Sequence, residues 1–133
     1  MRASNPALSI AIAIMALLIA VPVLAQERDS DGTRMQARHV ELGSVHNDSL
    51  SPPVDRADWR MIRLEEDATL TLELSVQPTN RSATLTLTGA TGNELASERA
   101  GSNAAKIESS LDAGIYYIAV ESSQELRYRL EIN

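Results

Sequence analysis

The sequence predicts an all-β protein, an antiparallel β-sandwich of about eight short strands. Apolar and polar residues alternate along several short segments, and turn-forming residues separate these segments at intervals of about ten residues. No amphipathic helical pattern interrupts them. The intervening segments are too short for the crossovers that join parallel strands, so antiparallel pairing is expected.

The clearest strand lies at 68–76, where apolar residues face one way and Thr, Glu and Ser the other. Such alternation is typical of a strand with one buried and one solvent-facing side. Residues 83–88 repeat the pattern after turn-forming residues at 78–80. The remaining strands are expected near 40–50 and at 59–64, 94–97, 105–111, 115–120 and 126–132.

The inward faces can be assigned for most strands. Gly114 lies between two expected strands, at a hairpin turn that needs a positive φ. In the two strands that follow, the alternating residues expected to point inward are Tyr116, Ile118 and Val120, then Tyr128, Leu130 and Ile132. The strand at 59–64 is ambiguous, because Trp59 and Met61 lie on one face and Ile62 and Leu64 on the other.

The acidic residues at 65–67 are expected to form a hairpin turn rather than a pair of catalytic carboxylates.

The first segment of the chain is typical of a secretory signal peptide. Arg2 precedes an apolar run at 7–25, which ends in the small residue Ala25. We therefore predict a signal peptide at 1–25, cleaved after Ala25, and a periplasmic or extracellular location. The run is also long enough to span a bilayer, so an uncleaved membrane anchor is the alternative. Residues 26–38 are polar and are expected to form a flexible linker before a folded domain at 39–133.

Composition excludes several classes of function. The 133 residues include no cysteine, which excludes a disulfide framework, a thiolate metal site and a cysteine nucleophile. There are 18 acidic against 12 basic residues, and Lys106 is the single lysine, so nucleic acid is not an expected partner. The sequence contains neither a G-x-S-x-G motif nor a glycine-rich phosphate loop. We therefore expect no enzymatic activity and no cofactor.

Oxygen-bearing side chains gather before the first core strand, at Asn47, Asp48, Asp55 and Asp58. Carboxylate and amide oxygens are the ligands that calcium prefers. Asp and Asn in loops more often form turns and caps, however, so no metal site is expected and these four residues are the calcium alternative.

Two other patterns resemble metal sites less closely. Asp29, Asp31 and Gly32 resemble the opening of a calcium loop, but the remaining ligands are missing, and a solvated linker is the better interpretation. His39 and His46 are the two histidines of the chain. Seven residues apart on one strand, they would point to opposite faces, so they are not expected to form a zinc pair.

Two motifs together carry a resemblance to a known family. Asp58 and Trp59 open an alternating strand, and residues 111–117 read Leu-Asp-Ala-Gly-Ile-Tyr-Tyr. In this order and spacing they resemble the bacterial pre-peptidase C-terminal domain, over about 43–132. That domain is a small, jelly-roll-like β-sandwich usually appended to secreted proteases and other exported enzymes. The family's pattern places Ile62 and Leu64 inside, but it expects an aromatic residue where this sequence has Arg60.

The resemblance implies a non-catalytic role. Such domains assist the secretion or stability of an attached enzyme or bind partner surfaces, and some relatives bind collagen and use calcium. We therefore expect a non-enzymatic exported binding or accessory module that contacts an envelope or secreted protein, with an exposed patch around Trp59 or Tyr117. One alternative is a structural envelope protein held by the uncleaved N-terminal helix, the only case in which membrane contact is expected. The other is calcium-assisted binding of a polysaccharide or matrix protein.

Overall fold

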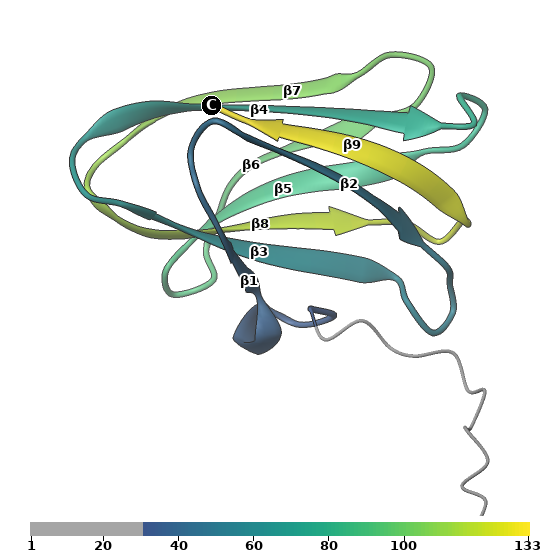
Figure 1. Cartoon of the computed structure of the whole chain (residues 1–133), viewed down its shortest axis with the longest axis horizontal. Helices are drawn as coiled ribbons and strands as arrows, with labels where there is room; N and C mark the ends of the chain where they lie inside the picture. Colours follow the sequence, from purple (N-terminus) through teal and green to yellow (C-terminus); the bar gives the residue numbers. More distant parts are fainter. Residues whose placement is uncertain (1–30) are drawn as a thin grey trace, which may run out of the picture.

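Two β-sheets packed face to face make up the computed structural model, which describes residues 31–133 (Figure 1). The five-stranded sheet has the order β1-β3-β8-β5-β6 and the four-stranded sheet the order β2-β9-β4-β7. The elements are η1 (Arg34–Gln36), β1 (Arg38–Val40), β2 (Ser44–Leu50), β3 (Ala57–Leu64), β4 (Ala68–Gln77), β5 (Ala83–Gly89), β6 (Glu94–Ala100), β7 (Ala105–Leu111), β8 (Gly114–Glu121) and β9 (Leu126–Ile132). The predicted β-sandwich is confirmed. The predicted signal peptide lies outside the described residues.

The strand count differs from the prediction because the segment expected near 40–50 forms two strands. Gly43, with a φ of 81°, lies where the chain leaves β1 in one sheet and enters β2 in the other. β1 then pairs with β3 in parallel, which contradicts the expectation of antiparallel pairing alone. No long crossover is needed, because β2 in the opposite sheet carries the chain back between the two parallel strands.

Most connections pass from one sheet to the other. Among the described strands, β5 and β6 are the only consecutive pair within one sheet. The predicted hairpins at 65–67 and at Gly114 are therefore wrong, since they join β3 to β4 and β7 to β8, which belong to different sheets. Alternation identifies the face of a strand that is buried, but it does not identify the neighbouring strand.

The core lies between the sheets and follows the period-two pattern. Leu70, Leu72, Leu74 and Val76 of β4 are fully or almost fully buried. They share one core cluster with Leu85, Leu87, Ile118 and Val120 of the opposite sheet. Tyr128, Leu130 and Ile132 are buried as predicted, and Tyr116 is partly buried against the same cluster. β3 points Ile62 and Leu64 inward, which resolves the ambiguity of that strand.

The residues before His39 belong to the fold, so the structure corrects the expected linker over 31–38. Asp31 is fully buried, and its backbone carbonyl accepts a hydrogen bond from the Trp59 amide at 2.8 Å. η1 follows, and the Arg34 guanidinium lies 5.4 Å from the centre of the Tyr117 ring. Trp59 and Tyr117 are half-buried, so the patch expected around them is only partly exposed. No helix among the residues that the structure describes is long and apolar enough to cross a membrane.

Candidate functional site

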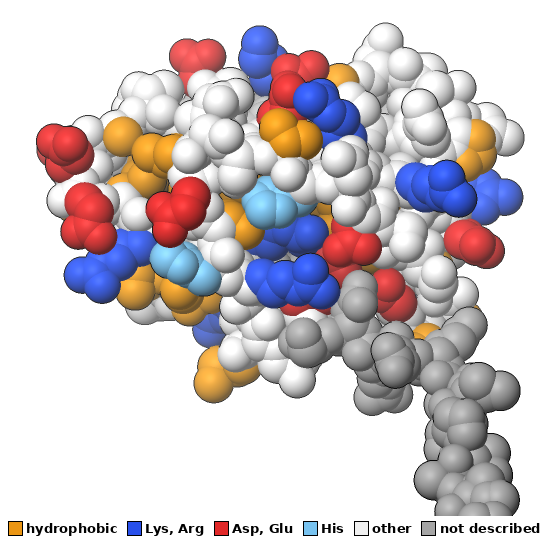
Figure 2. All heavy atoms as spheres, in the orientation of Figure 1, with side chains coloured by type: hydrophobic (Ala, Val, Ile, Leu, Met, Phe, Trp, Pro, Cys, Tyr) orange, Lys and Arg blue, Asp and Glu red, His pale blue; other side chains and the backbone are white. Residues whose placement is uncertain are grey.

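β2 is an edge strand of the four-stranded sheet, and β1, which lies beside β3, is an edge strand of the five-stranded sheet (Figure 1). A group of polar side chains connects the two sheets near these edges. We call this group the edge cluster; it comprises Asp31, His46, Asp48, Asp58, Arg60 and Tyr128. In Figure 2, acidic, basic and histidine side chains gather near the centre of the face that is shown. The inward alternation of β3 and the β2–β9 register, in which Asp48 lies opposite Tyr128, bring these residues together.

Arg60 is the central cation of the edge cluster and is 2% exposed. Its Nη2 lies 3.4 Å from Oδ2 of Asp48, and its Nη1 lies 3.9 Å from Oδ2 of Asp31. The guanidinium also lies 5.7 Å from the centre of the Tyr128 ring. Arg38 adds a second positive charge, with its Nε 3.3 Å from Oδ2 of Asp31. The carboxylates of Asp31 and Asp48 are therefore compensated by arginine, as a charge in a low-dielectric interior requires.

The pKa values of Asp58 and Tyr128 are both strongly raised in the cluster. The pKa of the Asp58 carboxyl is raised from 3.8 to about 7, chiefly by burial. The hydrogen bond that Tyr128 donates opposes this rise, and the negative charges of Asp31, Asp48 and Asp55 add to it. Burial likewise raises the pKa of the Tyr128 hydroxyl. Asp58 is therefore partly protonated near neutral pH, and Tyr128 remains a hydrogen-bond donor.

The two histidines lie on different strands, which corrects the assumption that they share one. His46 on β2 faces the edge cluster, with its Nε2 2.9 Å from the Ser44 hydroxyl oxygen. Burial and the charges of Arg60 and Arg38 lower the pKa of His46. His39 on β1 is exposed, 4.0 Å from a carboxylate oxygen of Glu41.

The structure brings together two of the four calcium candidates and adds a third carboxylate. Oxygens of Asp31, Asp48 and Asp58 lie within 4.8 Å of one another. Asn47 is exposed on the opposite side of β2, and Asp55 lies in the following loop, where its backbone pairs with Ser51. The sequence predicts that Asp31 lies in a solvated linker. The signal that singles it out is its place in the pattern Asp-x-Asp-Gly, which resembles the opening of a calcium loop.

The donor set of the edge cluster is suited to a hard cation in its chemistry but not in its charge balance. Three carboxylates supply hard oxygen ligands. Arg60 lies among them, however, so a cation would meet the guanidinium charge at short range. The residues present therefore fit a charge-compensated ion-pair network better than a calcium site.

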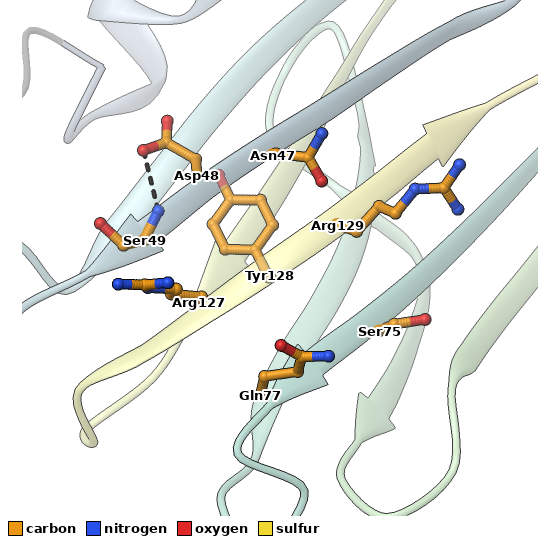
Figure 3. A pocket seen from close by; sticks show the side chains of 8 residues that line it. All are labelled: Asn47, Asp48, Ser49, Ser75, Gln77, Arg127, Tyr128 and Arg129. Carbon is orange, nitrogen blue, oxygen red and sulfur yellow. Dashed lines mark hydrogen bonds between the residues drawn. The ribbon is translucent and has the colours of Figure 1, made fainter.

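A second feature lies on the outer face of the four-stranded sheet, next to Asp48 and Tyr128. It is a cavity of about 440 Å³, and Figure 3 shows Arg127 and Arg129 of β9 between side chains of β2 and β4. Its lining residues are Asn47, Asp48, Ser49, Ser75, Gln77, Arg127, Tyr128 and Arg129. Sequence reasoning missed this cavity. The inward assignment of Tyr128 implied that Arg127 and Arg129 point outward, but it did not identify the strands beside β9.

Comparison with known proteins supports the fold. No protein-family model and no curated protein matches the sequence. Among solved structures, the pre-peptidase C-terminal domain of the collagenase from Bacillus anthracis is similar, with a TM-score of 0.65 and 18% identity. The similarity covers 73% of this chain and 94% of that domain.

Aeromonas hydrophila PliG, a periplasmic inhibitor of g-type lysozyme, is a more distant match, with a TM-score of 0.44 and 11% identity over 73% of this chain and 97% of that one. The resemblance that the sequence motifs predicted is thus confirmed at the level of the fold: the chain has the β-sandwich fold of a pre-peptidase C-terminal domain.

Proposed function

We propose that this protein is an exported, non-enzymatic binding or accessory module that contacts an envelope or secreted protein. The fold carries the proposal, since it is that of a domain found in a collagenase. Fold alone does not fix function, so the side chains must support it as well.

The polar groups of the edge cluster support a structural role for that cluster. Asp58 accepts a hydrogen bond from Tyr128, Asp48 pairs with Arg60, and His46 contacts Ser44. A catalytic base or nucleophile must instead be free to reach a substrate. Asp58 and Tyr128, the two groups with the most strongly raised pKa values, are thus engaged in holding the two sheets together.

Export is proposed from residues 1–25, whose composition is that of a signal peptide. Intact-mass analysis of the protein recovered from its native envelope or secreted fraction tests this. We expect a chain that begins at Gln26. A full-length species extracted only with detergent would instead favour the structural protein anchored by an uncleaved helix.

Binding to a protein partner is tested by cross-linking in the intact envelope, followed by mass spectrometry. We expect one dominant exported partner. A purified mature protein that hydrolyses an ester, peptide or glycoside, with activity that persists through further purification, would contradict the non-enzymatic proposal.

Calcium-assisted binding of a polysaccharide or matrix protein is the second candidate. The three neighbouring carboxylates favour it, whereas the Arg60 guanidinium among them opposes it. We therefore place it second to a metal-independent module, and a chelator experiment described below separates the two.

A further inference from the structure

A polar groove follows β9 along the outer face of the four-stranded sheet. The cavity of about 440 Å³ at Arg127 and Arg129 shares Ser49, Gln77 and Arg127 with a neighbouring cavity of about 780 Å³, which reaches Arg81. The two cavities therefore form one groove from the middle of β9 to the β4–β5 connection. We call it the β9 groove.

The strand register defines the walls of the β9 groove. Arg129 lies opposite Asn47 of β2 on one side and Ser75 of β4 on the other. Arg127 lies between Ser49 and Gln77 in the same way. Each arginine is thus flanked by uncharged side chains that can donate or accept hydrogen bonds. The view in Figure 3 shows these two arginines along β9, with the flanking residues on the strands beside it.

Three arginines, Arg81, Arg127 and Arg129, line the groove against two acidic residues, Asp48 and Glu125, so basic residues predominate there in a protein of net charge −6. Arg129 pairs with Glu131 at 2.9 Å, and Arg81 donates a hydrogen bond to the carbonyl oxygen of Glu125. The Arg127 guanidinium makes neither an ion pair nor a hydrogen bond with any residue in the described range 31–133. The Asp48 carboxylate on the wall does not neutralise it, because that group pairs with Arg60 and accepts from the Ser49 amide. Arg127 therefore offers an uncompensated guanidinium on the groove floor.

We propose that the β9 groove binds an extended acidic peptide segment of the partner protein, with carboxylates at alternating positions. This inference rests on the proposed function and names the chemistry of its partner. Residues two apart on a strand are separated by about 6.8 Å, and so are alternate side chains of an extended peptide. Acidic residues at alternate positions therefore match the spacing of Arg127 and Arg129, and carboxylates pair with guanidinium groups in a forked geometry.

The lining of the groove favours a peptide over a sugar chain. Its one aromatic residue is Tyr128, which is 3% exposed and so presents little ring surface for stacking on a sugar. The amides of Asn47 and Gln77 and the hydroxyls of Ser49 and Ser75 suit the carbonyl and amide groups of a peptide backbone.

The binding test uses the mature protein and a fluorescent peptide of alternating Thr and Asp, and it follows anisotropy. The comparison peptide has Asn in place of every Asp. We expect the acidic peptide to bind and the amide peptide to bind about tenfold more weakly. Affinity should also fall as salt is added. Equal affinity for the two peptides would overturn the proposal.

Matched variants locate the site. Arg127→Gln should weaken binding of the acidic peptide about tenfold, whereas Arg63→Gln, which removes an equal charge from an exposed position on the other sheet, should not. Thermal unfolding of both variants verifies that they fold. Equal effects of the two substitutions would overturn the proposal, because they would indicate attraction by net charge alone. Binding of polyuronate but not of the acidic peptide would also overturn it.

Photo-cross-linking separates failure of this inference from failure of the proposed function. A photoreactive residue at Ser75 in the groove should capture the exported partner, and Arg127→Gln should reduce that capture. The matched control carries the same group at Ser110, exposed on β7 of the same sheet. Capture from Ser110 alone would overturn the β9 groove as the docking site while leaving the proposed function intact. A further outcome is capture of the partner by a chemical cross-linker in an envelope where neither photoreactive position captures it. That result would also overturn the β9 groove as the docking site and leave the proposed function intact.

Discussion

Tyr128 donates a hydrogen bond from its hydroxyl group to Oδ2 of Asp58, and this bond joins the two sheets. Tyr128 belongs to β9 of the four-stranded sheet, and Asp58 lies 70 positions earlier, on β3 of the five-stranded sheet. Both side chains are buried. The bond therefore fixes one sheet against the other beside the edge cluster, and several of its consequences can be measured.

The acidity of Asp58 should make stability depend on pH. Its pKa is about 7 in the folded protein against an ordinary value of 3.8, so the folded state binds this proton more tightly than the unfolded state. The resulting stabilisation is complete below about pH 4 and is lost as the pH rises through 7. Urea titrations between pH 4 and 8 should therefore show Asp58→Asn gaining stability relative to the wild type as pH increases.

The exposed residue Asp112 supplies the control for that experiment. The stability of Asp112→Asn should follow that of the wild type across the same pH range. If the stability of Asp58→Asn also runs parallel to that of the wild type across this pH range, then Asp58 is ionised in the folded protein. The assignment of its raised pKa would then be wrong.

Removal of the Arg60 guanidinium should strongly destabilise the fold. Arg60→Met leaves the buried Asp31 carboxylate without its neighbour at 3.9 Å and Asp48 without its partner at 3.4 Å. Breaking one side of a buried ion pair costs about 3–5 kcal/mol of unfolding free energy. Arg63→Met, at an exposed arginine three positions later, should change stability by only about 0.5 kcal/mol in the same denaturant titration.

A double-mutant cycle tests whether this cost arises from the ion pairs. Asp31→Asn removes the buried negative charge, so it should recover part of the stability that Arg60→Met loses. Strictly additive effects of the two substitutions would show that packing of the arginine side chain, rather than its charge, accounts for the loss.

Calcium should have little effect on this protein. The charge-compensated network predicts nearly equal melting temperatures in chelator and in millimolar calcium. A bound cation at one hundred times its Kd would instead stabilise the fold by about 2.7 kcal/mol. A rise of several degrees in calcium that disappears in Asp31→Asn or Asp48→Asn would establish the edge cluster as a cation site.

Substitution of Gly114 should destabilise the fold because of the backbone conformation at this position. Its φ of 153° at the start of β8 is rarely adopted by residues with a side chain. Gly114→Ala should lower the free energy of unfolding by about 1–3 kcal/mol in a denaturant titration. Gly101→Ala is the matched control, because its added carbon would meet only ordinary contacts, the nearest at 3.7 Å. Equal and negligible effects would contradict this role of Gly114.

The sequence by itself determined which residues of most strands face the core. Leu70, Leu72 and Leu74 are buried as the alternation predicts, and so are Leu130 and Ile132. Period-two alternation is a local property, because successive side chains of any strand point to opposite faces. The inward faces could therefore be predicted without knowledge of the partner strands.

Only the tertiary structure decided which strands are neighbours and which polar residues meet. The expected hairpins proved to be connections between sheets, and Asp31, expected in a linker, is buried beside Arg60. The β9 groove likewise exists because β2 and β4 flank β9. Pairing between distant strands depends on the closure of the whole sandwich, which no local pattern encodes. Contacts such as the one between Asp58 and Tyr128 therefore appear only when both sheets are assembled.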